Sequence, residues 1–107
     1  MTTLIDRLRD ATENDHELFM EAYEMHVKKR DYEWRQRTLL LIRDRAFLDA
    51  ASMFAVDGWA YWSEKRLDEC SGGAWCTRTN GEEIILTGKT EANARLAVWL
   101  KVLDQAQ

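Results

Sequence analysis

The dipeptide Asn80-Gly81 constrains the fold more than any other feature of this chain. It separates two runs of strand-forming residues, 74–79 and 82–87. Asn and Gly both tolerate the positive φ angles that a two-residue type I′ turn requires. We therefore predict an antiparallel hairpin, and its register is set by that loop. The predicted pairs are Thr79 with Glu82, Arg78 with Glu83, Thr77 with Ile84, Cys76 with Ile85 and Trp75 with Leu86.

Side chains of this hairpin alternate between two faces. The face that we expect to meet the helices holds Trp75, Thr77, Ile84 and Leu86, and the other holds Ala74, Cys76, Arg78, Glu83 and Ile85. A first strand after Gly58 is expected to add aromatic surface to the second face, through either Trp59 and Tyr61 or Ala60 and Trp62. An aromatic face of this kind is either covered by a helix or offered to a partner.

Helical periodicity and capping residues predict helices on both sides of the strands. Thr2 or Thr3 begins the first helix and Asp15 the second, since their side chains can accept hydrogen bonds from unpaired backbone N–H groups. Asp31 begins a third helix whose apolar spacing continues to Asp57-Gly58. Residues 39–42 could instead form a short buried strand, but no turn signal separates them from the helical pattern that follows. Thr90 caps the last helix.

These elements predict an α+β fold, with N-terminal helices packed on a three-stranded antiparallel meander and followed by a C-terminal helix. A chain of 107 residues is long enough for one core. We expect one domain over 1–107, with a helical part at 1–56 and the meander plus last helix at 58–105. No run of about 18 apolar residues and no charged leader is present, so we expect a cytoplasmic protein, in the host cell if a phage encodes it.

Charge is unevenly distributed along the chain, whose net charge is −4. Residues 1–27 carry seven acids and two bases, whereas residues 28–45 carry seven bases and three acids. The first segment predicts an acidic partner-binding face made by Glu13, Glu17, Glu21 and Glu24. The second interleaves bases with aromatic rings, as single-stranded nucleic-acid sites do. This alternative patch comprises Lys28, Lys29, Arg30, Tyr32, Trp34, Arg35 and Arg37.

Catalytic, cofactor and metal motifs are not recognised in the sequence. His16 and His26 lack the spacing of a zinc site, and we interpret them as surface or helix-boundary residues. Five residues separate Cys70 from Cys76, a spacing that fits neither a C-x-x-C pair nor a disulfide framework, so free thiols are expected. Glu82 and Glu83 point to opposite strand faces and cannot act as an acid/base pair. We expect a protein without enzymatic activity.

Three stretches resemble a loose group of small proteins from tailed phages and prophages whose C-terminal half is an alternating helix and sheet sandwich. They are residues 4–13, residues 47–51 leading to residues 57–61, and residues 90–97. The resemblance implies a phage accessory protein that binds a host protein complex, including nucleic-acid-handling and defence complexes, as an anti-CRISPR-like inhibitor does. It implies no catalytic residues. A nucleic-acid-binding module that uses residues 28–37 and a self-assembling phage component are the alternatives.

Overall fold

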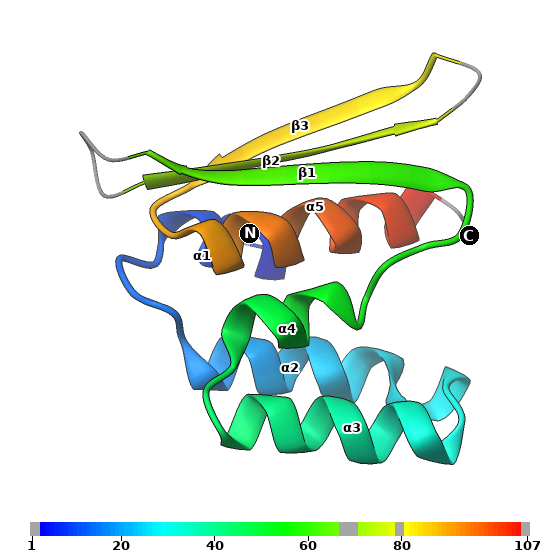
Figure 1. Cartoon of the computed structure of the whole chain (residues 1–107). Coiled ribbons are helices and arrows are strands. Elements are labelled where there is room, and N and C mark those ends of the chain that lie inside the picture. The colour runs from blue at the N-terminus through cyan, green and yellow to red at the C-terminus, as the bar shows by residue number, and fades with distance from the viewer. Residues whose placement is uncertain (1–2, 67–70, 79–80, 106–107) are drawn as a thin grey trace.

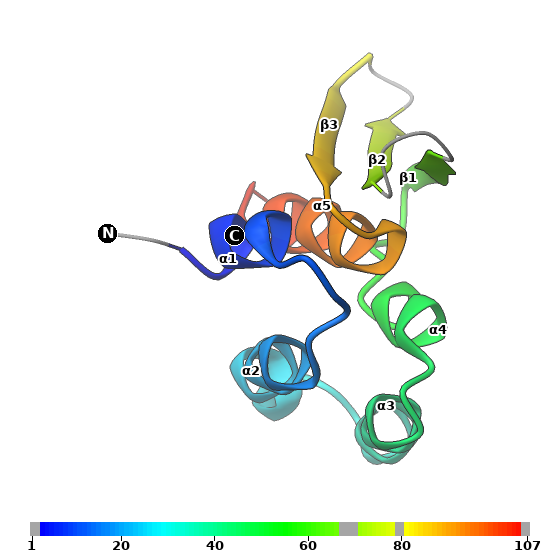
Figure 2. The ribbon, with the colours of Figure 1, turned by 90° about the vertical axis from the view of Figure 1, so that its left-hand side faces the viewer.

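The computed structural model describes residues 3–66, 71–78 and 81–105 and arranges them in three layers (Figure 1). A three-stranded antiparallel sheet of order β1-β2-β3 forms the first layer. Helices α1 and α5 lie against one face of it, and α2, α3 and α4 form the third layer (Figures 1 and 2). This confirms the predicted α+β class. The elements are α1 (Leu4–Asp10), α2 (His16–His26), the 3₁₀ turn η1 (Val27–Lys29), α3 (Tyr32–Arg43), α4 (Phe47–Ser52), β1 (Trp59–Arg66), β2 (Ser71–Arg78), β3 (Glu83–Gly88) and α5 (Glu91–Gln105).

Side-chain caps begin four of the helices, as the sequence predicts. The hydroxyl of Thr3 accepts a hydrogen bond from the Asp6 amide, and the Asp6 carboxylate closes a capping box. The carboxylate of Asp15 caps α2 and that of Asp31 caps α3. The Thr90 hydroxyl accepts from the amide of Asn93, 3.0 Å away, at the start of α5. Each cap satisfies a backbone donor that has no partner within its helix.

The third helix does not continue to Asp57-Gly58, and that prediction is wrong. Residues 39–42 are helical, but α3 ends at Arg43 and α4 begins at Phe47. Between them Arg45 has a φ of 59°, and the amides of Arg45 and Ala46 donate to the carbonyls of Ile42 and Leu41. This is the hydrogen-bond pattern of a Schellman motif. Glycine normally marks its left-handed position, so a sequence with arginine there gives no stop signal.

The hairpin pairs one residue out of the predicted register. Thr77 lies opposite Glu83 and Trp75 opposite Ile85. The pairing predicted for Thr79 falls outside the described residues. Five residues, 78–82, separate Thr77 from its partner Glu83, whereas the predicted register puts six residues between Thr77 and Ile84. An odd number of residues cannot be closed by a two-residue loop, and Gly81 has a φ of 93°. A slip of one residue moves every side chain of a strand to the other face, so the expectation that Trp75 meets the helices is wrong.

Small residues on β2 explain which face meets the helices. Gly72, Ala74 and Cys76 alternate along the strand, and each is buried. A Cβ atom added at Gly72 would lie 2.5 Å from both the backbone N and the Cα of Glu91. Because α5 approaches the strand this closely, only small side chains fit between them. A tryptophan cannot occupy that face.

Helix α5 is the central element of the core. Its buried residues cover almost its whole circumference: Ala92, Asn93, Ala94, Leu96, Ala97, Val98, Trp99, Leu100 and Val102. It lies between the sheet and the third layer (Figure 2). On the sheet side the ring of Tyr61 meets that of Trp99 edge to face, with centroids 5.1 Å apart. Among the described residues, no helix is long and apolar enough to span a bilayer.

Because α5 approaches β2 closely at Gly72, we predict that alanine substitutions at two neighbouring glycines have very different effects on the free energy of unfolding. Gly72→Ala forces a Cβ into the backbone of Glu91, and we expect it to lower the free energy of unfolding by about 1–3 kcal/mol through overpacking. Gly73→Ala is the matched control, since its Cβ meets nothing within 4 Å. Urea denaturation should show a change of less than about 0.5 kcal/mol for the control. Equal stabilities for the two variants would contradict the close approach.

Candidate protein-binding surface

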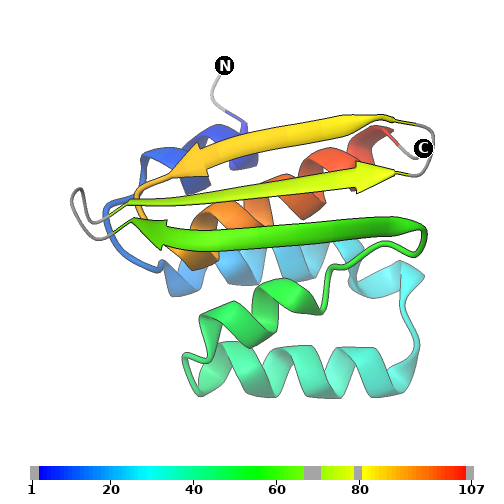
Figure 3. The same ribbon diagram turned by 45° about the horizontal axis from the view of Figure 1, so that its top comes forward.

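The outer face of the sheet, which points away from α1 and α5, carries a row of apolar side chains. Register places Trp62 on β1 opposite Trp75 on β2, and Trp75 opposite Ile85 on β3. Tyr61 and Ser63 contact residues of α5, so their neighbour Trp62 points to the opposite side. Figure 3 looks onto this side of the sheet, and no helix lies across it. We call Trp62, Trp75 and Ile85 the apolar row.

The apolar row is both exposed and ordered by its own contacts. Trp62 is 61% exposed and Ile85 is 61% exposed, while Trp75 between them is half-buried. The rings of Trp62 and Trp75 stack with centroids 5.9 Å apart and an interplanar angle of 13°. Cross-strand aromatic pairs of this kind stabilise a sheet and hold each other's orientation. The row therefore presents two stacked indole rings and an exposed isoleucine side by side.

Polar and small residues surround the apolar row. One neighbouring cross-strand row is Glu64, Gly73 and Thr87, and the other is Ala60, Thr77 and Glu83. Glu64, Glu83 and Thr87 are exposed. Gly73 is itself buried, although a Cβ added there would meet nothing within 4 Å. The acids Glu64 and Glu83 lie at diagonally opposite corners of this face.

Sequence reasoning anticipated an aromatic outer face but misassigned part of it. Ile85 and Glu83 lie on this face as predicted, and Trp62 is the aromatic residue that β1 adds. Ala74 and Cys76 were expected there too, yet both are buried on the helix side. Trp75 belongs to the apolar row, whereas the sequence analysis placed it on the helix side of the sheet. Small residues at every second position of β2 were the available signal.

The acidic residues predicted to bind a partner are only partly available. Glu17, Glu21 and Glu24 lie on one side of α2. Glu17 and Glu24 are exposed, but Glu21 forms an ion pair with Arg7 that joins α2 to α1. Glu13 is an exposed residue between these helices, and its backbone carbonyl accepts a hydrogen bond of 2.8 Å from Asn93. The structure therefore leaves Glu17 and Glu24 as the exposed pair on this helix.

The basic and aromatic segment is largely engaged in holding the third layer together. The Trp34 ring stacks on Tyr23 and meets Phe54 edge to face, and its Nε1 donates to the Met53 carbonyl at 2.6 Å. The guanidinium of Arg30 lies 4.9 Å from the centre of the same ring. Arg35 donates from Nε to the Val27 carbonyl. A ring packed in this way is not open to stack on a base. Tyr32, Lys28, Lys29 and Arg37 remain exposed.

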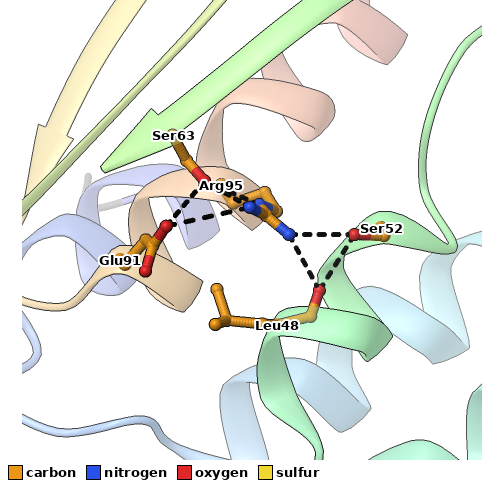
Figure 4. A network of polar contacts seen from close by, with 5 residues as sticks. All are labelled: Leu48, Ser52, Ser63, Glu91 and Arg95. Atoms are coloured by element: carbon orange, nitrogen blue, oxygen red, sulfur yellow. Dashed lines mark hydrogen bonds and ion pairs between the residues drawn. The ribbon is translucent and has the colours of Figure 1, made fainter. Parts of the chain in front are cut away.

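A polar cluster around Arg95 joins the three layers (Figure 4). The Arg95 side chain donates to the Ser63 hydroxyl of β1 and to the Ser52 hydroxyl of α4, the latter at 3.1 Å. Its guanidinium is 3.8 Å from the Glu91 carboxylate and lies over the ring of Tyr61. Glu91 also accepts from Ser63. Each of these polar groups has a partner within the protein, so we interpret the cluster as a structural connection between β1, α4 and α5.

A surface hollow of about 470 Å³ lies where η1, the α4–β1 connection and α5 meet. It is lined by His26, Lys29, Arg30, Ala55, Val56, Asp57 and Leu103. Burial lowers the pKa of His26, and the nearby Arg30 and Lys29 lower it further, whereas Asp104 acts in the opposite direction. The hollow mixes both signs of charge, and its histidine packs against Phe54.

Nucleophilic and metal chemistry find no support in the described part of the chain. Burial raises the pKa of the Cys76 thiol to about 12, so it stays protonated at neutral pH and is a poor nucleophile. Cys76 is a free thiol, and Cys70 lies outside the described residues. Three or more potential metal ligands do not gather anywhere in residues 3–66, 71–78 and 81–105.

Comparison of the chain with protein-family models, with curated proteins and with solved structures finds no match.

The Arg95 cluster predicts that substitution of Arg95 costs much more unfolding free energy than substitution of Arg7. Arg95→Met keeps the aliphatic stem but removes charged hydrogen bonds in a site where the side chain is 17% exposed, and we expect a loss of about 2 kcal/mol in unfolding free energy. Arg7→Met, which breaks an ion pair whose side chains are 43% exposed, should cost well under about 1 kcal/mol. Chemical denaturation measures both. Equal losses of unfolding free energy in the two variants would contradict a stabilising role for the Arg95 cluster.

His26 predicts a dependence of stability on pH. Its pKa in the folded protein is below the ordinary value of 6.5, so protonation favours the unfolded chain. The stability contributed by this residue is complete above pH 6.5 and is lost as the pH falls below it. His26→Gln should therefore lose less unfolding free energy than the wild type between pH 7 and pH 5. An identical loss in both proteins would contradict the lowered pKa.

Proposed function

We propose that this protein acts by binding another protein through the outer face of its sheet, without catalysing a reaction. The observation that carries the proposal is the apolar row, in which Trp62 and Ile85 are each 61% exposed beside Trp75. Exposed apolar side chains are common singly, but three side by side on one sheet face are typical of an interaction surface.

The composition of the apolar row suits a binding site energetically. Burying apolar surface contributes about 25 cal/mol per Å², and tryptophan offers more surface than any other side chain. Tryptophan is also enriched among the few residues that dominate binding energies. Because the two rings already stack on each other, little side-chain entropy is lost when a partner covers them. Neighbouring polar residues would form the rim of such an interface.

The proposed partner is a protein of the host cell. Resemblance to small phage and prophage proteins suggests an inhibitor of a host complex that handles nucleic acid. The net charge of −4 favours partners with basic surfaces through long-range attraction. Glu17 and Glu24, exposed on the far layer, would add to this attraction without contacting the same partner surface. Self-assembly through the apolar row is the second candidate, because the same face could meet a second copy.

Paired variants test the proposal. Ile85→Ser and Trp62→Ser remove the apolar row's exposed members, whereas Leu40→Ser on α3 removes an aliphatic side chain that is 58% exposed on another layer. Tagged proteins would be used to capture partners from nuclease-treated lysate of the host, with quantification by mass spectrometry. We expect the wild type and Leu40→Ser to capture the same protein. The amount of that protein captured by Trp62→Ser should be lower by about tenfold or more.

Retention of the captured protein by both outer-face variants would contradict the proposal. Circular dichroism and urea denaturation of each variant would show that the fold is kept, since neither Trp62 nor Ile85 belongs to the buried core. The nucleic-acid alternative makes a different prediction. The wild type would then recover nucleic acid from lysate that has not been treated with nuclease, and charge reversal of Lys28, Lys29 and Arg37 would abolish this recovery.

A further inference from the structure

We infer that two copies of this protein pair through the free edges of their β1 strands and form one continuous antiparallel sheet. The second copy would lie beside β1 in the plane of the sheet, so the outer face would stay open. Tyr61 and Ser63 would provide the backbone hydrogen bonds, and Trp62 would lie opposite Trp62 of the second copy. The inference rests on the edge of the sheet and is independent of the proposed function.

The two edges of the sheet differ in what lies beside them. β3 contacts α1, and Arg9 of this helix donates from Nε to the Thr87 carbonyl at 2.8 Å. That hydrogen bond satisfies a backbone acceptor at the β3 edge. β1 ends the sheet on the other side, and among the described residues no helix lies beside it in the layer of the sheet (Figure 2). The β1 edge is therefore available for pairing.

Two hydrogen bonds show which backbone groups of β1 face its free edge. Trp59 donates its N–H to the carbonyl of Val56, which is 3.3 Å away and outside β2. Backbone groups of alternate residues point to the same side of a strand, so those of Tyr61 and Ser63 also point away from β2. The outward carbonyl of Thr87 gives the same result when it is traced through the register of the three strands. No loop, helix or side chain among the described residues hydrogen-bonds to the backbone of Tyr61 or Ser63.

The β1 edge lacks most of the features that protect an edge strand from pairing. β1 is eight residues long, and its register with β2 runs without a bulge from Trp59 to Arg66. The chain contains no proline that could block a hydrogen bond along the edge. Charged residues occupy only the last three positions, 64–66, and the five residues before them include three aromatic ones. Such an edge is a template for another strand.

Exposure on both faces of β1 favours an occupant at the edge. Tyr61 is 40% exposed, and its neighbour Trp62 is 61% exposed. Their rings lie on opposite faces, because Tyr61 contacts Trp99 on the helix side and Trp62 stacks on Trp75 on the outer side. A partner on the outer face could cover Trp62 alone. A strand added at the edge would lie beside both rings and cover part of each.

A second β1 strand fits this edge in a register that joins the two apolar rows. Residues that exchange hydrogen bonds in an antiparallel pair must both direct their backbone groups across the interface. Pairing Tyr61 with Ser63 of the second copy meets this condition, and it places a two-fold axis beside Trp62. Trp62 then lies opposite its own counterpart, and Ala60 lies opposite Glu64. A shift of two residues either way would place Trp62 opposite Ala60 or Glu64 and interrupt the joined row.

Cysteine cross-linking tests this register in the full chain. Ala60→Cys and Glu64→Cys are made separately in a Cys70→Ser background, mixed, oxidised and separated without reductant. Opposed Cα atoms at such a position are about 4.5 Å apart, within the range that a disulfide spans. Identical positions of the two copies would be roughly 13 Å apart along the strand. We therefore expect at least about tenfold more cross-linked dimer in the mixture than in either protein alone. Equal amounts in all three samples, or no cross-linked dimer, would overturn the inference.

Proline at the edge provides a second test. Tyr61→Pro removes an N–H that points away from β2, so the hydrogen bonds within the sheet are kept. Tyr61→Ala is the matched control, because it loses the same ring but keeps the N–H. Sedimentation velocity over a wide range of concentration should show a dimer of the wild type and of Tyr61→Ala. The dissociation constant should be weaker by about tenfold or more in Tyr61→Pro, since symmetry removes the donor twice.

A wild type that stays monomeric at every concentration, or a dimer that tolerates the proline, would overturn the inference. Circular dichroism would show whether Tyr61→Pro keeps its fold, and the cross-linking result decides if it does not. A monomeric wild type whose capture of a host protein is lost in Tyr61→Pro alone would assign the edge to a strand of that protein. Failure of the dimer would leave the proposed function standing, because that function is tested at Trp62 and Ile85.

Discussion

The close contact between α5 and β2 is the constraint on which the rest of the structure depends. The backbone at the start of α5 lies so near Gly72 that even a methyl group would collide with it. Beyond Gly72 the strand presents Ala74 and Cys76 to the same helix, and both are buried. Close packing of this kind maximises dispersion contacts but leaves no room for large side chains. The helix can therefore lie in the middle of the molecule and bury nine of its 15 residues.

This constraint also determines what faces outward. Because alternate residues of a strand point to opposite sides, small residues beneath β2 place Trp75 on the open side. Register then aligns Trp62 and Ile85 with it in one row. The polar cluster around Arg95 fixes β1 relative to α4 and α5, so the stacked tryptophans rest on a rigid support. A requirement of packing on one face thus creates the apolar surface on the other.

The sequence predicts correctly which segments form helices and strands, but it predicts helix ends and strand register less well. The caps at Thr3, Asp15, Asp31 and Thr90 are local signals, and each begins a helix as expected. The break at Arg45 was missed because its left-handed conformation is imposed by hydrogen bonds across the turn and by packing of the following helix. The hairpin register was predicted wrongly because Asn-Gly occurs in hairpin loops of more than one length. The register is determined by the packing of β2 against α5, which the dipeptide does not encode. Charged and aromatic residues were identified as candidate surfaces, but the sequence alone does not reveal the intramolecular partners of residues such as Glu21 and Trp34.

Residue-resolved labelling of tryptophan in the free protein tests the central claim most directly. A tryptophan-selective reagent, applied briefly and read by mass spectrometry, compares Trp62 with Trp99, which is 1% exposed. The structure predicts rapid modification of Trp62 and almost none of Trp99, at every protein concentration. Protection of Trp62 equal to that of Trp99 would mean that the outer face is already covered, and it would contradict the account of an open binding surface.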